Sequence, residues 1–294
     1  APLTIKRMVI PNRFASTSHA PGYASGGRVT ERYVRYEAEK ARGGVGLVQF
    51  GGATTVSIEN TYYYGQLNGT GDAIIADLAR IARAIHEHGS VCTVQLSHGG
   101  RRERHDMAHW IPAFAPSVRR ELKHRAFPAE IEHHDIDRVA RDYATAACRI
   151  RDSGVDGVEI SCIPPGLIGQ FWSPLTNQRT DDYGGSLHNR LRFGFEVLEQ
   201  TRNLVGEDYV VGMRLSADEF TDGGLDNQAL VEIAGRYAEC GLVDYVSVVG
   251  GHSSDHRTNH DMYPSMHKPR APYLSMAAAI KEKVDLPVLH ATRI

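Results

Sequence analysis

The chain has 294 residues, a formal net charge of −2, 41% hydrophobic residues and 23% charged residues. These values are typical of a globular protein, and no excess charge indicates a nucleic-acid or membrane-surface partner. No apolar run approaches the roughly 20 residues that cross a membrane, and the N-terminal segment lacks the layout of a signal peptide. The four cysteines are far apart in the sequence, which argues against a disulfide framework or a zinc site and favours reduced thiols in the cytoplasm.

Short apolar runs alternate with amphipathic stretches along the whole chain. The apolar runs predict strands at 13–18, 46–50, 91–96, 157–161, 210–215, 245–249 and 287–292. The stretches between them have apolar residues spaced about 3.6 apart, and several end at glycine, as helices do. The predicted helices are 31–42, 73–89, 136–154, 189–206, 227–241 and 273–284. Uniformly apolar strands that alternate with helices indicate a parallel sheet covered by helices.

The number of strands favours one parallel architecture over another. A single series of seven strand–helix units suits an eightfold (β/α)8 TIM barrel better than a Rossmann sheet, and no GxGxxG follows a strand. The chain stops after its seventh strand, so strand eight is absent, and a barrel with seven strands would leave an unpaired edge. We therefore expect 1–294 to be one incomplete barrel domain of a longer protein.

Barrel enzymes place their chemistry at the carboxyl ends of the strands. This rule selects the segments 16–20, 51–55, 95–102, 161–166, 214–219, 250–256 and 291–293. Long insertions at 99–134 and 251–271 follow the third and sixth strands, and such loops usually shape a substrate pocket.

Residues 157–193 closely resemble the fourth strand and following loop of the Old Yellow Enzyme family of FMN barrels. The family pattern QF…P…N.RTD.YGGS..NR.RF is matched by Gln170, Phe171, Pro174, Asn177, Arg179, Thr180, Asp181, Tyr183, Gly184, Gly185, Ser186, Asn189, Arg190 and Phe193. We expect Arg179, Asp181 and Arg190 to have a structural role, joining this loop to the helix that begins near Ser186.

The resemblance extends over the whole chain and implies an FMN site. The implied cofactor-binding residues are Ser18, His19, Ala20, Gly52, Gln95, Arg214 and Arg293. The Gln95 amide offers a donor and an acceptor to the flavin pyrimidine. Arg214 would lie near flavin N1 and O2, where a fixed cation stabilises the anionic reduced flavin. Arg293 resembles a phosphate ligand of FMN. A structural role for Gln95 or Arg214 is the alternative.

The chain is most similar to the multidomain branch of the family, which includes trimethylamine dehydrogenase, 2,4-dienoyl-CoA reductase, and the demethylases of dimethylglycine and N-methylproline. Members of this branch commonly carry a 4Fe-4S cluster and a nucleotide-binding domain for FAD or NAD(P)H, which we expect only in sequence beyond this chain. Some members attach FMN through a cysteine at the position of Ala20, so we expect non-covalent FMN here. The resemblance also implies an electron-transfer partner and a homo-oligomer.

The strand-four loop departs from the carbonyl-reducing members of the family. Their histidine or asparagine pair and a nearby tyrosine correspond here to Ser161, Pro164 and Gly166, and proline and glycine offer no side-chain donor. Oxidation of an amine does not require a carbonyl clamp. We therefore predict oxidative N-demethylation or dehydrogenation of a small N-methylated amine or amino acid. The alternatives are an NAD(P)H-dependent enoate or dienoyl-CoA reductase and a non-catalytic flavin-binding electron-relay subunit.

Further residues at the strand ends complete the predicted site. We assign catalytic roles to Arg214 and His252 and place His98 and His252 with the strand-four residues in the substrate pocket. His252, His256 and His260 are four apart, which on a helix would suit a metal, but the surrounding polar residues predict a loop and no metal site.

Two other stretches have both an ordinary and a functional interpretation. The tyrosines at 62–64 suit either a packed loop or an aromatic wall around an alkylammonium group. The basic runs at 101–105 and 119–125 form either a solvated face or a binding surface for a carboxylate or a CoA phosphate.

Overall fold

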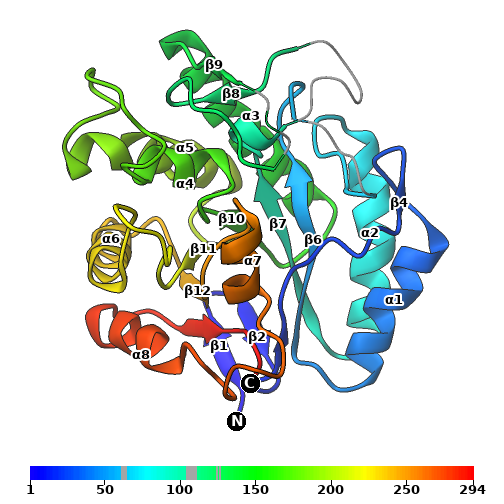
Figure 1. Cartoon of the computed structure of the whole chain (residues 1–294). Helices are drawn as coiled ribbons and strands as arrows, with labels where there is room; N and C mark the ends of the chain where they lie inside the picture. Colours follow the sequence, from blue (N-terminus) through cyan, green and yellow to red (C-terminus); the bar gives the residue numbers. More distant parts are fainter. Residues whose placement is uncertain (61–64, 104–110, 124, 126) are drawn as a thin grey trace. The chain divides into compact units, whose positions relative to one another are not determined.

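The computed structural model describes residues 1–294 except 61–64, 104–110, 124 and 126, so the tyrosines at 62–64 lie outside the described residues. Its main sheet has seven strands in the order β13-β12-β11-β10-β7-β6-β3. Each strand therefore neighbours the next strand of the series along the chain, which is the connectivity of a (β/α)8 barrel. The predicted fold class is confirmed (Figure 1).

All seven predicted strands and all six predicted helices are present. The strands are β3 (Ala15–Ser16), β6 (Leu47–Thr55), β7 (Val91–Ser97), β10 (Gly157–Ser161), β11 (Val210–Ser216), β12 (Tyr245–Val249) and β13 (Val288–His290). The helices are α1 (Glu31–Arg42), α2 (Ala73–His86), α3 (His133–Asp152), α5 (Leu187–Val205), α6 (Asn227–Glu239) and α8 (Leu274–Lys283). No helix within the described ranges is both long enough and apolar enough to cross a membrane.

One compact unit comprises 1–98, 138–160 and 197–212. In it β3, β6, β7 and β10 pair in parallel, and α1 and α2 lie side by side along β6 and β7 (Figure 1). Two short antiparallel pairs were not predicted: β1 (Leu3–Ile5) with β2 (Met8–Ile10), and β4 (Ala24–Ser25) with β5 (Arg28–Val29). The register places Gln49 beside Thr93 and Gln95 beside Glu159, so polar side chains share one face of this sheet.

The second unit comprises 99–137, 161–196 and 213–294. Here β12 and β13 pair in parallel, and α6 packs beside α8 (Figure 1). The insertion after β7 contains the 3-10 helix η1 (Gly100–Arg102) and the strands β8 (Phe114–Ala115) and β9 (Ala129–Glu130). The loop after β10 contains α4 (Leu167–Trp172).

The prediction that the histidine-rich stretch after β12 is a loop is wrong, because α7 (His256–Met262) begins there. Asp255 accepts the backbone N–H of Thr258, and the Thr258 hydroxyl accepts the backbone N–H of Asp255. This reciprocal capping box stabilises the first turn of a helix whose composition is otherwise unfavourable. His252 precedes the helix and lies outside it.

Candidate active site

The amide of Gln95, near the carboxyl end of β7, is held in one orientation. Its Nε2 donates to Glu159 Oε1 at 2.7 Å, and Nε2 of Gln49 donates to Glu159 Oε2 at the same distance. Glu159 and Gln49 are fully buried. The Nε2 of Gln95 therefore faces Glu159 on the neighbouring strand β10. Its Oε1 accepts a hydrogen bond from the backbone N–H of Ala53 at 3.4 Å.

The segment Ser18 to Ala20, for which the resemblance implies flavin contacts, lies against the end of β6. Ser18 Oγ donates to the carbonyl of Phe50 at 2.9 Å, and the backbone N–H of Gly52 donates to the carbonyl of His19 at 3.2 Å. A Cβ on Gly52 would lie 2.3 Å from the backbone of His19, so only glycine allows this approach. The His19 ring contacts the Tyr36 hydroxyl at 2.9 Å, and Ala20 is exposed.

Arg214 on β11 is a buried cation without an ion pair. Its Nη1 donates to Ser247 Oγ at 3.0 Å, and no carboxylate in the described part of the chain forms a salt bridge with it. A buried guanidinium with only a neutral partner is costly unless an anionic group approaches it. The residues present therefore fit a flavin, whose pyrimidine edge becomes anionic on reduction.

Arg293, the implied phosphate ligand, is engaged by the main chain of its own unit. Its Nη1 donates to the carbonyl oxygens of Ser265 and Lys268, and its own carbonyl accepts from the N–H of Ala271 at 2.8 Å. A phosphate would have to replace or share these contacts. The role of Arg293 stays a prediction.

The strand-four positions form a tightly packed turn. Ser161, Pro164 and Gly166 are all buried, and the N–H of Gly166 donates to the carbonyl of Ile163 at 2.9 Å. Gly166 is the N-cap of α4 and has no side chain to contribute. The side chains at these positions thus provide no pair of hydrogen-bond donors of the kind that holds a carbonyl oxygen.

His252, after β12, is buried and neutral. Its Nδ1 accepts from the backbone N–H of Ser254 at 3.1 Å, which places the proton on Nε2, 3.4 Å from Thr221 Oγ1. Burial lowers the pKa of His252 to about 4, although Asp255 opposes this shift. At neutral pH the ring can donate from Nε2 without carrying a charge.

His98, also predicted in the substrate pocket, is fully buried in the first unit. Its Nε2 lies 3.1 Å from Glu59 Oε1, and Arg138 Nη2 donates to the same oxygen at 3.0 Å. Burial would raise the pKa of Glu59, but these contacts with His98 and Arg138 hold it well below its ordinary value. The imidazole is therefore fixed within a charged cluster, and its pocket role stays a prediction.

Two further residues of the second unit have charges that matter here: Glu219, to which the sequence assigned no role, and Arg101, which the sequence treated only as part of the basic run at 101–105. Glu219 follows β11, is 1% exposed, and accepts from Ser173 Oγ at 3.0 Å; burial raises its pKa to about 7. Arg101 lies in η1, and its charge is one of the influences that lower the pKa of His252. Both belong to segments that the strand-end rule selected, but that rule does not distinguish one polar residue from its neighbours.

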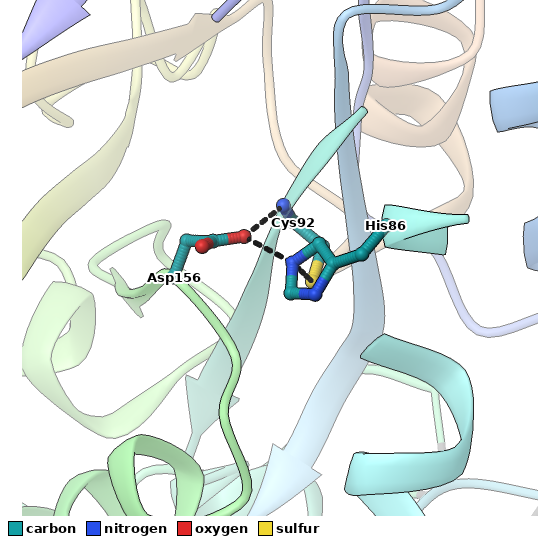
Figure 2. Close-up of side chains that lie close together, drawn as sticks. All are labelled: His86, Cys92 and Asp156. Atoms are coloured by element: carbon teal, nitrogen blue, oxygen red, sulfur yellow. Dashed lines mark hydrogen bonds and ion pairs between the residues drawn. The ribbon is translucent and has the colours of Figure 1, made fainter. Parts of the chain in front are cut away.

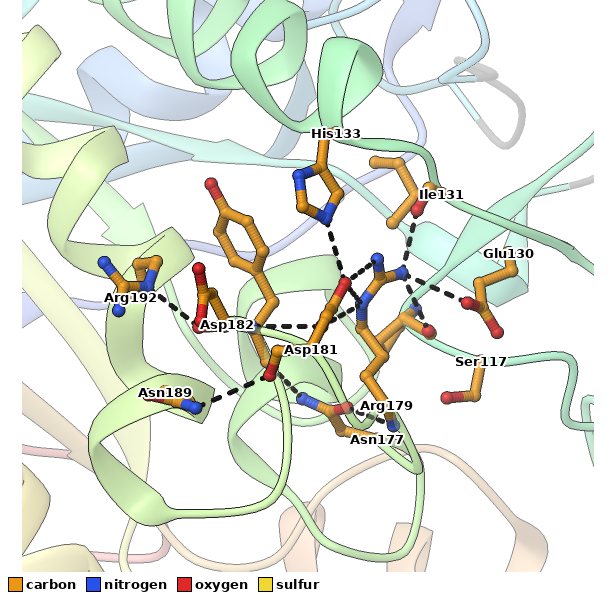
Figure 3. A network of polar contacts seen from close by, with 12 residues as sticks. Ser117, Glu130, Ile131, His133, Asn177, Arg179, Asp181, Asp182, Asn189 and Arg192 are labelled. Atoms are coloured by element: carbon orange, nitrogen blue, oxygen red, sulfur yellow. Dashed lines mark hydrogen bonds and ion pairs between the residues drawn. The ribbon is translucent and has the colours of Figure 1, made fainter.

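The residues of the signature run serve the fold, as predicted for Arg179, Asp181 and Arg190. Arg179 donates to Asp181 at 2.5 to 3.1 Å and to the carbonyl oxygens of Pro116 and Ile131 at 3.2 and 2.8 Å (Figure 3). The hydrogen bonds from Arg179 hold the pKa of Asp181 well below its usual range. Arg190 on α5 donates to a carbonyl at the end of α4 at 2.7 Å. This network joins the loop after β10 to the insertion after β7.

A different cluster lies at the amino ends of the strands. His86 Nε2 is 2.8 Å from Asp156 Oδ2 and 3.9 Å from Cys92 Sγ (Figure 2), and among the described residues only these three could hold a metal ion together. Asp156 also accepts the N–H of Cys92 at 2.8 Å, and burial raises the pKa of the Cys92 thiol. One imidazole nitrogen serves both contacts, so the cluster is no Cys–His–Asp relay, which needs both nitrogens. We interpret it as a structural link between α2, β7 and β10.

Comparison with known proteins gives a consistent result. Residues 1–294 match the model of the NADH:flavin oxidoreductase / NADH oxidase family. The chain is 43% identical over 295 residues to an N,N-dimethylglycine/sarcosine dehydrogenase of Chromohalobacter salexigens, covering 100% of this chain and 42% of that protein. It is 42% identical over 294 residues to a multifunctional alkene reductase/demethylase OYE of Caballeronia cordobensis, covering 100% of this chain and 43% of that protein. The chain thus spans less than half the length of these relatives.

A solved structure of a 2-naphthoyl-CoA reductase in complex with 2-naphthoyl-CoA is also similar. The TM-score is 0.91 at 27% sequence identity, over 99% of this chain and 46% of that one.

Proposed function

The chain belongs to the NADH:flavin oxidoreductase / NADH oxidase family, and from this premise we propose that it is the FMN-binding barrel of an amine-oxidising enzyme. The reaction would be oxidative N-demethylation or dehydrogenation of a small N-methylated amine or amino acid. The similar dehydrogenase of Chromohalobacter salexigens, whose name contains two such substrates, supports this choice.

The observation that carries the proposal is the turn after β10. Ser161, Pro164 and Gly166 are buried there without a pair of side-chain donors, so the turn cannot clamp a carbonyl oxygen by the family's usual pair. Loss of hydride from a C–H bond next to nitrogen is assisted by the nitrogen lone pair instead. The substrate then needs to be positioned, and its nitrogen needs to be neutral.

Gln95 and Arg214 would hold the flavin, and Ala20 gives it no thiol to bond with. Bound FMN supplies the acceptor for the hydride. Arg214 provides the charge that favours the reduced state, and Gln95 provides an amide of fixed orientation. His252, neutral and buried, would donate a hydrogen bond from Nε2 toward the substrate.

Anaerobic mixing of the FMN-loaded protein with dimethylglycine tests this function. We expect bleaching of the visible flavin absorbance and, after hydrolysis of the iminium product, one formaldehyde per demethylated amine. Mass spectrometry should show FMN released on denaturation, since we propose non-covalent attachment. A flavin that no N-methylated amine reduces would refute the proposal.

The name of the relative from Caballeronia cordobensis includes alkene reductase, so a reductase activity is the second candidate. It is supported if NAD(P)H reduces the flavin and an activated enone reoxidises it. A flavin that reacts with neither class of substrate would favour an electron-relay subunit.

The remaining features of the proposal concern the longer protein. We propose that the whole enzyme passes electrons to an acceptor through iron–sulfur and nucleotide-binding domains, as a homo-oligomer. Four free cysteines, of which Cys92 and Cys162 are buried, support a reducing compartment such as the cytoplasm.

A further inference from the structure

The backbone at Arg101 is fixed by Gln170, a buried residue of the signature run. The N–H of Arg101 donates to Gln170 Oε1 at 3.1 Å, and Gln170 Nε2 donates to the carbonyls of Gly99 and Pro165 at 3.0 and 2.7 Å. A Cβ on Gly100, which has φ +59°, would lie 2.5 Å from Gln170 Nε2. The main chain therefore places Arg101 in a defined position after β7 without using its side chain.

The guanidinium of Arg101 is partly buried but has no hydrogen bond or salt bridge to any residue that the structure describes. Its neighbour Arg102 has partners: Nη1 donates to the carbonyl and hydroxyl of Ser253 at 3.1 and 2.8 Å, and Nε lies 3.8 Å from Glu121 Oε1. Two adjacent arginines therefore have different surroundings, and of this pair it is the Arg101 guanidinium that has no direct partner in the described part of the chain.

Two acids, Glu121 and Glu219, act on this charge electrostatically, but neither forms a hydrogen bond or salt bridge with the Arg101 guanidinium among the described contacts. Burial lowers the pKa of Arg101, and this effect exceeds the opposing influence of Glu121 and Glu219. Glu219 has a pKa of about 7, because of burial, and its Oε2 accepts from Ser173. His252 is neutral. A guanidinium that is partly withdrawn from water without a direct ion pair is unfavourable, and an anion bound to it removes that cost.

We propose that Arg101 binds the carboxylate of an N-methylated amino-acid substrate. This inference rests on the proposed function and specifies its substrate class. The planar guanidinium can pair with a carboxylate through two parallel hydrogen bonds, which fixes direction as well as position. The FMN phosphate is a poorer occupant, because barrel enzymes usually bind phosphate at the loops after strands seven and eight, whereas Arg101 follows strand three.

The test compares two amines that differ in the carboxylate, dimethylglycine and dimethylamine. Loss of charge-assisted hydrogen bonds in Arg101→Gln should lower kcat/KM for dimethylglycine by about 10- to 100-fold and leave dimethylamine oxidation nearly unchanged. Arg101→Lys, which keeps the charge but loses the fork, should fall between. Arg102→Gln is the matched control, and it should not change the preference of the protein for dimethylglycine over dimethylamine.

A binding measurement separates this inference from the proposed function. Trimethylglycine has a carboxylate but no nitrogen lone pair, so it cannot be oxidised, and its Kd can be measured by calorimetry. We expect Arg101→Gln to weaken its binding by about the same factor. Oxidation of both amines with an unchanged preference in Arg101→Gln would overturn the carboxylate site and leave the function intact. If no amine reduces the flavin, the function fails, while weaker trimethylglycine binding in the variant would still support the site.

Discussion

Glu159→Gln is the sharpest test of how the barrel prepares the flavin site. Both carboxylate oxygens of Glu159 accept hydrogen bonds: Oε2 from Gln49 and Oε1 from Gln95, each at 2.7 Å, and all three side chains are buried. Glutamine has the same shape but carries only one acceptor oxygen, and its other terminal atom is a donor. In either orientation of the new amide, one of the two partner amides therefore faces a second donor.

The expected magnitude follows from this mismatch. A buried donor without an acceptor costs about 1–3 kcal/mol. Gln95 can relieve the conflict by rotating its amide, and this reverses the donor and acceptor that it presents to the flavin pyrimidine. If this mismatch reduces the free energy of FMN binding by about 1–2 kcal/mol, the variant binds FMN roughly 5- to 30-fold more weakly.

Quenching of flavin fluorescence during titration measures the FMN Kd, and circular dichroism reports whether the fold persists. Thr93→Val is the matched control, because Thr93 lies two residues before Gln95 on β7 and its buried Oγ1 has no hydrogen-bond partner among the described residues. It should leave the FMN Kd unchanged and stabilise the fold by about 1 kcal/mol. A folded Glu159→Gln variant that binds FMN as tightly as the wild type would show that Glu159 does not orient Gln95.

Three further predictions concern stability. Burial raises the pKa of Glu219 from 4.5 to about 7, so the free energy of unfolding should fall as the pH rises from 4.5 to 7, and Glu219→Gln should remove this dependence in urea titrations. Arg179→Ala should lower the free energy of unfolding by about 2–3 kcal/mol, because two buried carbonyls and Asp181 lose their donors; a loss within 0.5 kcal/mol would contradict the structural role. The hydrogen bond to Asp156 raises the pKa of His86 above 6.5. The pair should therefore stabilise the fold below pH 6.5 and lose this effect as the pH rises through the folded-state pKa. In Asp156→Asn, the Tm should depend less on pH over this range than it does in the wild type.

The elements that sequence analysis predicted are those with strong local signals. The helix predicted at 31–42 matches α1 (Glu31–Arg42), since Thr30 caps Tyr33 N–H and basic residues end the helix. α7 was missed because its start depends on an Asp255–Thr258 capping box, which differs from the common Ser/Thr-x-x-Glu form. The stretch is also rich in Ser, Asp, Asn and Thr, which favour loops, so its composition predicted a loop instead of a helix.

Gln95 shows where prediction of the site ends. The resemblance to the FMN barrels implied that this amide contacts the flavin, but not which way the amide faces. The direction depends on Glu159, which lies 64 residues later and contacts Gln95 only because β7 and β10 pair in this register. Gln49 also donates to the Glu159 carboxylate, although the two residues are 110 positions apart in the sequence. Neither follows from local sequence.

The turn after β10 and the loop after β7 together would explain how the proposed amine-oxidising site lacks the family's usual polar pair. Ser161, Pro164 and Gly166 are buried in a compact turn. The side chains that recognise the substrate would therefore have to come from another strand end in the same unit. Gln170 links that turn to the backbone of Arg101, and the one signature residue therefore serves both segments. Sequence alone treats Arg101 and Arg102 as equivalent members of a basic run. Their partners differ: Ser253 and Glu121 hold Arg102, whereas the partly buried guanidinium of Arg101 has no direct partner among the described residues. If the carboxylate binds there, selectivity for amino acids over simple amines comes from strand three, and the turn after strand four needs only to be compact.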